Sequence, residues 1–467
     1  MNTIRLCAAT LLTGLLSTTS VTAVNAADLG GNCCADLEER VAELEATTAR
    51  KGNRKVSLAI TGYVAEQVMW YDNGATDDFY VTGIGSTLNS NFKLTGSANI
   101  NSDVSAGYVI QVEVSTSDPL TAGNTAFKDD GPSAYHITNS NGGLSSPSID
   151  VLYSYWFIDS KRLGKVTVGQ LPQASEHAAV VVDGSGSFVA ANWVPLNGTA
   201  INLAHGNNQL YLPNGAGLAI GALQWCSSTS LPIAGDCNAI PINGVRYDSP
   251  TFAGFSVSTT WGEDDFWDVA GRFAGEFNGI KLAASIAYSK NNDESNLTGF
   301  NTVLGLSPLQ KRDAGYLQIG AYIQHVPTGL FAYGAYGKEY NKNVYYDMPG
   351  MAGTGAATTR GEPDGHTWYV KAGLRRKWMP LGHTVLYGDY SERNDTFAPN
   401  LALFGVTDSK VTQYGLGVVQ EIDAAAMSMW INWNHSDPEA HGGRGNHNPL
   451  GKFEDLDVVT AGALISF

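Results

Sequence analysis

Three histidines near the carboxy-terminus are the residues best suited to bind a metal ion. His435, His441 and His447 are six residues apart, and Asp437 and Glu439 lie between the first two. Because this spacing in a glycine-rich segment does not hold imidazoles on one rigid face, a solvated loop is the better interpretation. The nucleophile-elbow pattern G-x-S-x-G and the phosphate-loop pattern G-x-x-x-x-G-K-[ST] are both missing. We therefore expect no catalytic residue, no metal site and no cofactor.

A different kind of chemistry is indicated by charged residues on what should be the polar faces of strands. In the segment after Leu171, Glu176, His177 and Asp183 occur in a stretch that has no clean strand period. Elsewhere, alternation assigns six basic and two acidic residues to polar faces: Lys93, Glu113, Arg246, Asp268, Arg272, Lys281, Lys371 and Arg375. Opposite charges across a narrow aqueous passage would orient dipolar solutes. The alternative is that some of these charges are hydrated at strand ends, which we expect for Arg246 and Arg375.

Two of the five cysteines suggest a covalent link. Cys226 and Cys237 lie in a turn-rich stretch, whereas Cys33 and Cys34 are adjacent and Cys7 is near the amino-terminus. A disulfide between Cys226 and Cys237 would close a small loop and would require an oxidising compartment. Free thiols are the alternative, and a metal site made of two cysteines is less favoured.

The composition excludes several classes of protein. Charged residues make up 15 % of the chain, with 28 Lys and Arg against 44 Asp and Glu, and the net charge is -16. This charge repels polyanions, so no nucleic-acid partner is expected. The 53 glycines and 10 % aromatic residues, without runs of about 20 apolar residues, favour a large β architecture.

The amino-terminal region is expected to contain an export signal and a stalk. Arg5, an apolar stretch and Val24-Asn25-Ala26 predict a signal peptide over residues 1–26. Residues 27–54 are then predicted to form a periplasmic coiled-coil stalk, because Leu37, Val41 and Leu44 are three and four residues apart. Two heptads are marginal alone, so this helix either joins an oligomer or frays without a partner.

Residues 55–467 are predicted to form a transmembrane antiparallel β-barrel. Apolar and polar residues alternate in segments close to the 9 to 11 residues that a tilted strand needs to cross a bilayer. Short turns such as Asn278-Gly279 alternate with long polar connections such as Asn341 to Gly365. The count is sixteen strands, or eighteen if Asn207 to Trp225 forms a wall hairpin.

The third connection, at about residues 172–240, is expected to fold inward, since the lumen of such a barrel is too wide to be filled by wall side chains. A loop that covers the outer mouth is the alternative. The last strand ends in Phe467, with Val459, Ala461, Ala463 and Ile465 on one apolar face, a pattern read by the outer-membrane assembly machinery. A soluble β-sandwich also alternates, but it would leave such long strands with exposed edges.

The stalk sequence from Cys33 to Leu58 and the segment DSPTFAGFSVSTTWGEDDFWDVAGRFAGEF from Asp248 resemble alphaproteobacterial porins of the Rhizobiales type. The resemblance spans the mature chain. It implies a homotrimer of sixteen-stranded barrels in outer-membrane lipid and lipopolysaccharide, which admits small hydrophilic solutes by passive diffusion through a constriction formed by the third loop. Several outer-membrane proteins of that group are cross-linked to peptidoglycan through an amino-terminal Ala-Asp, which Ala27 and Asp28 match. Tethering of the outer membrane is therefore the alternative function.

Overall fold

The computed structural model describes a large part of the chain. Its described residues are 56–85, 88–115, 148–192, 198–206, 208–209, 218–226, 231–232, 241–263, 265–292, 313–342, 344–346, 359–361, 364–398, 401, 406–442 and 451–467. The expected signal peptide (1–26), the stalk (27–54) with Leu37, Val41 and Leu44, the Ala27-Asp28 pair, Cys237 and His447 lie outside the described residues. No helix among the described residues is long and apolar enough to span a membrane.

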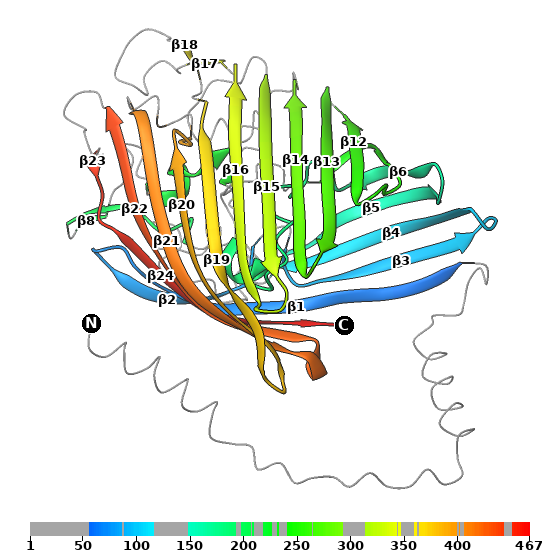
Figure 1. The fold of residues 1–467 in the computed structure, drawn as a ribbon. Helices are drawn as coiled ribbons and strands as arrows, with labels where there is room; N and C mark the ends of the chain where they lie inside the picture. Colours follow the sequence, from blue (N-terminus) through cyan, green and yellow to red (C-terminus); the bar gives the residue numbers. More distant parts are fainter. Residues whose placement is uncertain are drawn as a thin grey trace. The chain divides into compact units, whose positions relative to one another are not determined.

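Sixteen antiparallel strands form a closed barrel, as expected. Each strand pairs with its neighbours in the chain, and the ladder between Tyr63–Asp72 of the first strand and Asp457–Ser466 of the last closes the sheet. Figure 1 shows the central strands side by side in this order. The wall consists of β1 (Ser57–Asp72), β3 (Asn91–Asn99), β4 (Val104–Ser115), β5 (Ser148–Ser160), β6 (Gly164–Leu171), β11 (Ile242–Asp248), β12 (Phe255–Gly262), β13 (Phe266–Phe277), β14 (Ile280–Asn291), β15 (Ala314–His325), β16 (Leu330–Asn341), β19 (His366–Met379), β20 (Gly382–Asn394), β21 (Val406–Ile422), β22 (Met427–Gly442) and β24 (Leu456–Ser466).

The remaining strands lie outside this ring of pairings. β2 (Asp77–Thr82) pairs with the end of β1, and β23 (Gly451–Lys452) pairs with β22. The wall hairpin considered for Asn207 to Trp225 is not formed by the described part of that segment. There, β8 (Asn208–Gln209) pairs with β7 (Ala204–His205), and β9 (Trp225–Cys226) pairs with β10 (Leu231–Pro232). β17 (Val344–Tyr346) and β18 (Thr359–Gly361) form another short pair.

The two faces of the wall follow the expected alternation of apolar and polar residues. In β15, Ile319 and Ile323 are exposed, whereas Gln318 and Tyr322, the residues that precede each of them, are buried. Large apolar side chains are exposed on the same face of other strands, among them Val64, Val257, Val269, Ile286, Val370, Leu386 and Leu416. In an outer-membrane barrel this face contacts lipid, and the opposite face lines the lumen.

Short turns join several neighbouring strands of the wall. Between β13 and β14, Asn278 and Gly279 both have positive φ, of 50° and 77°, as a two-residue hairpin turn requires. Before β22, the 3₁₀ turn η4 (Asp423–Ala425) is tied to β19 by Lys377, whose Nζ donates to Asp423 Oδ2 over 2.8 Å. This hydrogen bond lowers the pKa of the Asp423 carboxyl below its usual value.

Two apolar clusters lie on the lumenal side of the wall. The first joins Met69 and Tyr71 of β1 to Leu456 and Val458 of β24 and to residues of the connection after β6 that are given below. The second gathers Tyr322, Tyr333, Tyr387 and Trp430 from four strands around Val182. Because both clusters include residues of the connection after β6, this connection fills part of the lumen. Its path therefore determines how wide the remaining aqueous passage is.

Candidate pore constriction

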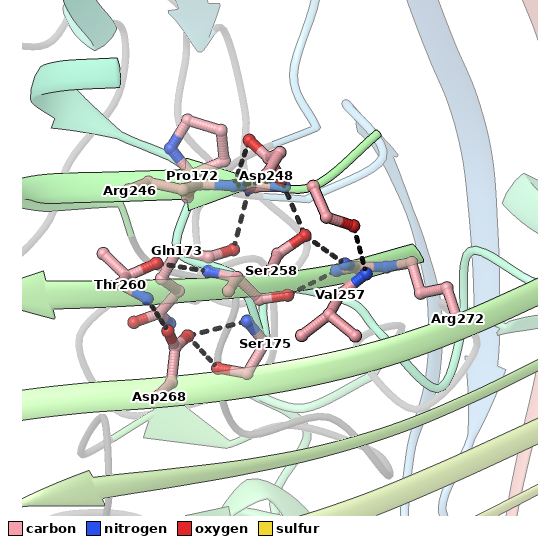
Figure 2. Close-up of polar contacts among 12 residues, drawn as sticks. Pro172, Gln173, Ser175, Arg246, Asp248, Val257, Ser258, Thr260, Asp268 and Arg272 are labelled. Atoms are coloured by element: carbon pink, nitrogen blue, oxygen red, sulfur yellow. Dashed lines mark hydrogen bonds and ion pairs between the residues drawn. The ribbon is translucent and has the colours of Figure 1, made fainter. Parts of the chain in front are cut away.

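We call residues 172–241, between β6 and β11, the third loop. Its first residues are held by Arg246 of β11, whose Nη1 donates to the carbonyl oxygens of Pro172 over 2.9 Å and Gln173 over 3.2 Å. The Nε and Nη2 of the same guanidinium bond the carboxylate of Asp248. Figure 2 shows these contacts. The expectation that Arg246 is simply hydrated is wrong, because its guanidinium makes five hydrogen bonds, two of which fix the start of the loop.

The next residues bond side chains of β12 and β13. Ala174 N donates to Thr260 Oγ1 over 2.7 Å, and the Ala174 carbonyl accepts a hydrogen bond from Arg272. Both the backbone N–H and the hydroxyl of Ser175 donate to Asp268 Oδ2 at 2.6 Å, and Asp268 is fully buried. Asp268 and Arg272 were predicted as wall residues, and Figure 2 shows that they meet the loop backbone.

The loop then passes along β14, β15 and β16. Gln318 donates to the Ser175 carbonyl and accepts from Ala179 N, each over 2.8 Å. Ser285 donates to the Ala178 carbonyl, and Tyr333 Oη donates to the Ala179 carbonyl over 2.8 Å. A Cβ at Gly320 would lie 2.1 Å from Ala179 O, so this close approach requires glycine. Inward-facing side chains of the wall hydrogen-bond the loop backbone, as a neighbouring strand would. The buried N–H and C=O groups of the loop therefore have hydrogen-bond partners without regular secondary structure.

A buried ion pair fixes the next turn of the loop. Lys371 Nζ of β19 lies 2.5 Å from Asp183 Oδ2, and neither side chain is exposed. The ammonium also lies 5.6 Å from the ring centroids of Tyr333 and Tyr387. The sequence predicts that Asp183 and Lys371 both line the pore, but it does not predict that they pair with each other. In the structure, the direct partner of Asp183 is Lys371.

The described residues in the rest of the loop contact β22 and the residues that follow β1 and β20. Asn432 donates to the carbonyl of Ala190, in the π-helical turn η1 (Phe188–Asn192). After residue 197, Asn73 Nδ2 donates to Asn202 O over 2.7 Å. Thr396 Oγ1 donates over 2.9 Å to the carbonyl oxygen of Leu223, which ends the 3₁₀ turn η3 (Ile220–Leu223). The apolar side chains of this second part complete the first lumenal cluster: Ile201, Leu203, Leu218, Ile220 and Leu223.

Glu176 and His177 lie at the start of the loop beside β5. Tyr153 Oη donates to Glu176 Oε1 over 2.5 Å, and His177 Nε2 lies 3.9 Å from the same oxygen. His177 has φ of 51°, a left-handed conformation that turns the chain at this point. Glu113 of β4 is buried on the same face of the wall.

The remaining predicted wall residues are Lys93, Lys281 and Arg375, of which Arg375 lies beside the loop: a Cβ added at Gly186 would be 3.1 Å from its Nε. Lys93 of β3 pairs in register with Thr61 and Gln111. Lys281 is exposed near the short turn that starts β14, opposite Glu276. Arg375 was expected to be hydrated, but its guanidinium bonds Glu421 at 2.8 and 2.9 Å, so that expectation is wrong.

Sequence reasoning missed the neutral side chains that hold the loop. Thr260, Ser285, Gln318, Tyr333 and Asn432 are all inward-facing and buried or bonded to the loop. The signal that could have found them is that each is a polar residue in the middle of a strand, at a position where polar and apolar residues alternate. That signal predicts a polar face, but it does not distinguish a side chain bonded to protein from one bonded to water.

The interpretation of the segment around His435 and His441 as a solvated loop is wrong, because both residues lie in strand β22 and pair with β21. Among the described residues, no group of three or more His, Cys, Asp or Glu side chains could hold a metal ion. His435 instead lies 3.0 Å from Asp457 and 3.5 Å from Asp455, and His441 lies 2.8 Å from Asp408.

Comparisons with known proteins place the fold. A family model described as Gram-negative porin matches residues 9–428. The anion-selective porin from Comamonas acidovorans has a TM-score of 0.51 at 15 % identity, over 88 % of this chain and 100 % of that one. OmpF of Salmonella typhi, in complex with daunomycin, has a TM-score of 0.48 at 12 % identity, over 89 % and 99 %. The trimer form of OmpT of Vibrio cholerae has a TM-score of 0.46 at 12 % identity, over 88 % and 99 %. No curated protein matches the sequence.

Proposed function

The chain belongs to the Gram-negative porin family, an outer-membrane channel family, and on that premise we propose that it admits small hydrophilic solutes and ions by passive diffusion. The single observation that supports this most is the first part of the third loop, which is bonded to the lumenal face of at least six strands. A barrel of sixteen strands leaves an aqueous lumen unless a segment narrows it. Such a channel needs no catalytic residue and no cofactor.

The narrowest part of the channel is proposed to be bounded by the loop residues Glu176, His177 and Asp183. On the wall, Lys93, Glu113, Asp268, Arg272, Lys281 and Lys371 face the same lumen, with different tasks. Asp268, Arg272 and Lys371 support the loop, because each bonds a loop atom. Lys93 and Glu113 are assigned to the wall along which ions pass, and Lys281 to the exit at the short-turn rim.

The finer family assignment is a porin of the Rhizobiales type. It is supported by the stalk sequence, in which Leu37, Val41 and Leu44 form the seam, and by the segment from Asp248 to Phe277. Under this proposal residues 1–26 are the signal peptide, residues 27–54 form the stalk and residues 55–467 form the barrel. The mature chain assembles as a homotrimer in contact with lipopolysaccharide, after recognition of the Phe467 strand by the outer-membrane assembly machinery.

A disulfide between Cys226 and Cys237 is part of the proposal. It is supported by the position of Cys226, which is fully buried next to Tyr316 of β15. The bond would fix the end of the third loop before the chain enters β11.

Single-channel recording in planar bilayers tests the channel. Stepwise currents that scale with salt concentration, and a reversal potential of small magnitude under a salt gradient, are expected because charges of both signs line the passage. Protein that inserts as folded barrels but carries no current would overturn the proposal.

Peptidoglycan tethering is the second candidate, supported by Ala27-Asp28 at the proposed mature amino-terminus. Protein that remains on purified sacculi after boiling in detergent would support it. Ala27→Gly with Asp28→Ala should then release the protein, whereas complete release of the unchanged protein by boiling detergent would contradict tethering.

A further inference from the structure

A groove with a volume of about 970 Å³ lies on the wall between β13 and β22, and we call it the wall groove. Ile323, Val370 and Leu416 line it and are exposed, so it opens on the face that contacts lipid in an outer-membrane barrel. Small residues on this face, on five neighbouring strands, also line it: Ala284, Ala321, Ala332, Gly334, Ala372 and Gly388. Because these side chains are so small, the groove reaches the strand backbone.

The packing of the barrel does not require the smallest of these residues. Gly334 does not have the positive φ that favours glycine, and a Cβ placed there would meet no atom closer than the Tyr369 carbonyl oxygen, at 3.7 Å. Gly320 differs, because a Cβ there would lie 2.1 Å from Ala179 O. Glycine inside a strand weakens it and often marks a site that another molecule approaches closely. The space in front of Gly334 is therefore available to a molecule outside the barrel.

The lining of the wall groove is apolar and aromatic. Phe273 and Leu282 border it from β13 and β14, and the aromatic residues Tyr390, Tyr414 and Trp433 border it from β20, β21 and β22. A hydrocarbon chain in such a recess is contacted from several sides, so it gains more dispersion energy than a chain on a flat wall. An acyl chain therefore fits the groove.

A lysine lies beyond one end of the wall groove. Lys338 faces outward on β16, four residues after Gly334, and its Nζ lies 5.1 Å from the Tyr340 ring centroid. Lys290 of β14 is paired with Asp313, whereas Lys338 makes no ion pair with a carboxylate of a described residue. Four residues span about 13 Å along a strand, which is about 10 Å of depth when the strand is tilted by about 40°. An anionic headgroup at Lys338 would thus have its acyl chain at the level of the groove.

The end of β16 that carries Lys338 is the end away from a short turn. β15 ends at His325 and β16 begins at Leu330, with only residues 326–329 between them. Short turns are periplasmic in outer-membrane barrels, so Lys338 lies on the side of the outer leaflet. In the Gram-negative outer membrane that leaflet contains lipopolysaccharide, whose lipid anchor carries acyl chains and phosphates.

We propose that the wall groove binds an acyl chain of lipopolysaccharide, and that a phosphate of the lipid anchor binds the Lys338 ammonium. An ammonium and a phosphate form a charge-assisted hydrogen bond, and the Tyr340 ring holds the lysine at the edge of the apolar face. The inference deepens the proposed contact with lipopolysaccharide and rests on the outer-membrane location of the barrel. It does not depend on the path of solutes through the lumen.

Titration of the purified full-length protein with bis-phosphorylated lipid A, the lipid anchor, tests the site by native mass spectrometry. Lipid A should bind several-fold more tightly than its dephosphorylated form and than phosphatidylglycerol with chains of the same length. Equal binding of phosphatidylglycerol would overturn the assignment to lipopolysaccharide. Single-channel recording of the same protein separates the two proposals. Currents without lipid A binding would refute the site alone, and lipid A binding without currents would refute the channel alone.

Two variants address the acyl chain and the headgroup separately. Gly334→Leu fills the groove and should weaken binding of both forms of lipid A several-fold. Gly271→Leu is its matched control, because a Cβ at Gly271 would meet no atom closer than 3.8 Å and this outward-facing residue does not line the groove. Lys338→Gln should weaken only the phosphorylated form, down to the affinity of the dephosphorylated one. Lys161→Gln, in an exposed turn, should change neither affinity.

Lys338→Gln leaves the packing of the wall as it is, so it decides the proposal even if Gly334→Leu does not fold. Unchanged affinities for lipid A in the variants at Gly334 and Lys338 would overturn the site. A change of mass in light scattering of Gly334→Leu, with unchanged lipid affinity, would also overturn it, because a second copy of the chain would then occupy the groove in place of lipid.

Discussion

Lys371 Nζ of β19 lies 2.5 Å from Asp183 Oδ2 of the third loop, in a contact that solvent does not reach. A buried ion pair contributes little more stability than packed apolar residues of the same volume, but loss of one partner leaves a buried charge unpaired. The pair therefore determines where the loop lies more than how stable the barrel is.

Loss of either partner of this pair should loosen the loop. Asp183→Asn or Lys371→Met is expected to destabilise the local structure by about 3–5 kcal/mol, whereas Asp183→Leu combined with Lys371→Met should cost less than either single change. Hydrogen exchange of residues 183–192 measures the effect. Lys377→Met provides the control, because its pair with Asp423 is exposed to solvent and therefore contributes little to stability. Equal exchange in the single variants and in the control would contradict this role.

Close contact between loop and wall makes Gly320 sensitive to substitution. The methyl group of Gly320→Ala would meet the Ala179 carbonyl at 2.1 Å, so the loop must move away from β15. The expected result is an altered single-channel conductance with an unchanged barrel. Ala321→Val adds volume at the next residue, on the exposed face, and should leave conductance as it was. If the two variants conduct alike, the loop does not lie against the wall at this point.

Most of the barrel could be predicted because its signals are local. Period-two alternation in β15 sets which residues face lipid, and turn residues such as Asn278-Gly279 set where one strand ends and the next begins. The strand count depended on one segment, since a short apolar run such as Leu218 to Leu223 fits a wall strand and a packed loop equally well. Only contacts with residues as distant as Met69 and Phe453 distinguish the two.

The loop contacts could not be predicted because their partners are far apart in the sequence. Asp183 and Lys371 are separated by 188 positions, and no local pattern states which wall cation meets which loop acid. The same limit applies to Arg246 and Arg375, whose positions near strand ends suggested hydration although both are bonded to protein.

Reduction of the proposed Cys226–Cys237 bond should affect the third loop alone. The bond closes a loop of about a dozen residues and in the chain-entropy model contributes roughly 3 kcal/mol. Faster proteolysis after residue 226, without loss of the heat-resistant barrel on gels, is the expected result. The control is the Cys226→Ser, Cys237→Ser variant, which should behave as the reduced protein does. Two free thiols in protein isolated without reductant would contradict the bond.

The trimer is expected to be held mainly by barrel walls, because a helix of two heptads is marginal alone. Deletion of Ala35 to Arg50 removes Leu37, Val41 and Leu44 and should leave trimers in mild detergent, with a modest loss of thermal stability. Light scattering of the purified protein measures the mass. Monomers after this deletion would show that the stalk, and not the wall, joins the subunits.

Removal of Ser175 to Val194 tests the constriction directly. The described part of this segment bonds β5, β13, β14, β15, β16, β19 and β22, so its loss should widen the lumen and raise conductance.

Neutralisation of Glu176 and Asp183 together should shift the reversal potential towards anions, and most of that shift should come from Glu176, because Asp183 is already paired with Lys371. The shift should shrink as salt rises, since charges are screened beyond about 10 Å at 0.1 M. If the deletion leaves conductance and reversal potential unchanged while the barrel stays folded, the narrowest point lies instead in the second part of the loop, where Ile201, Leu203 and Leu223 belong to the apolar cluster of Met69 and Phe453.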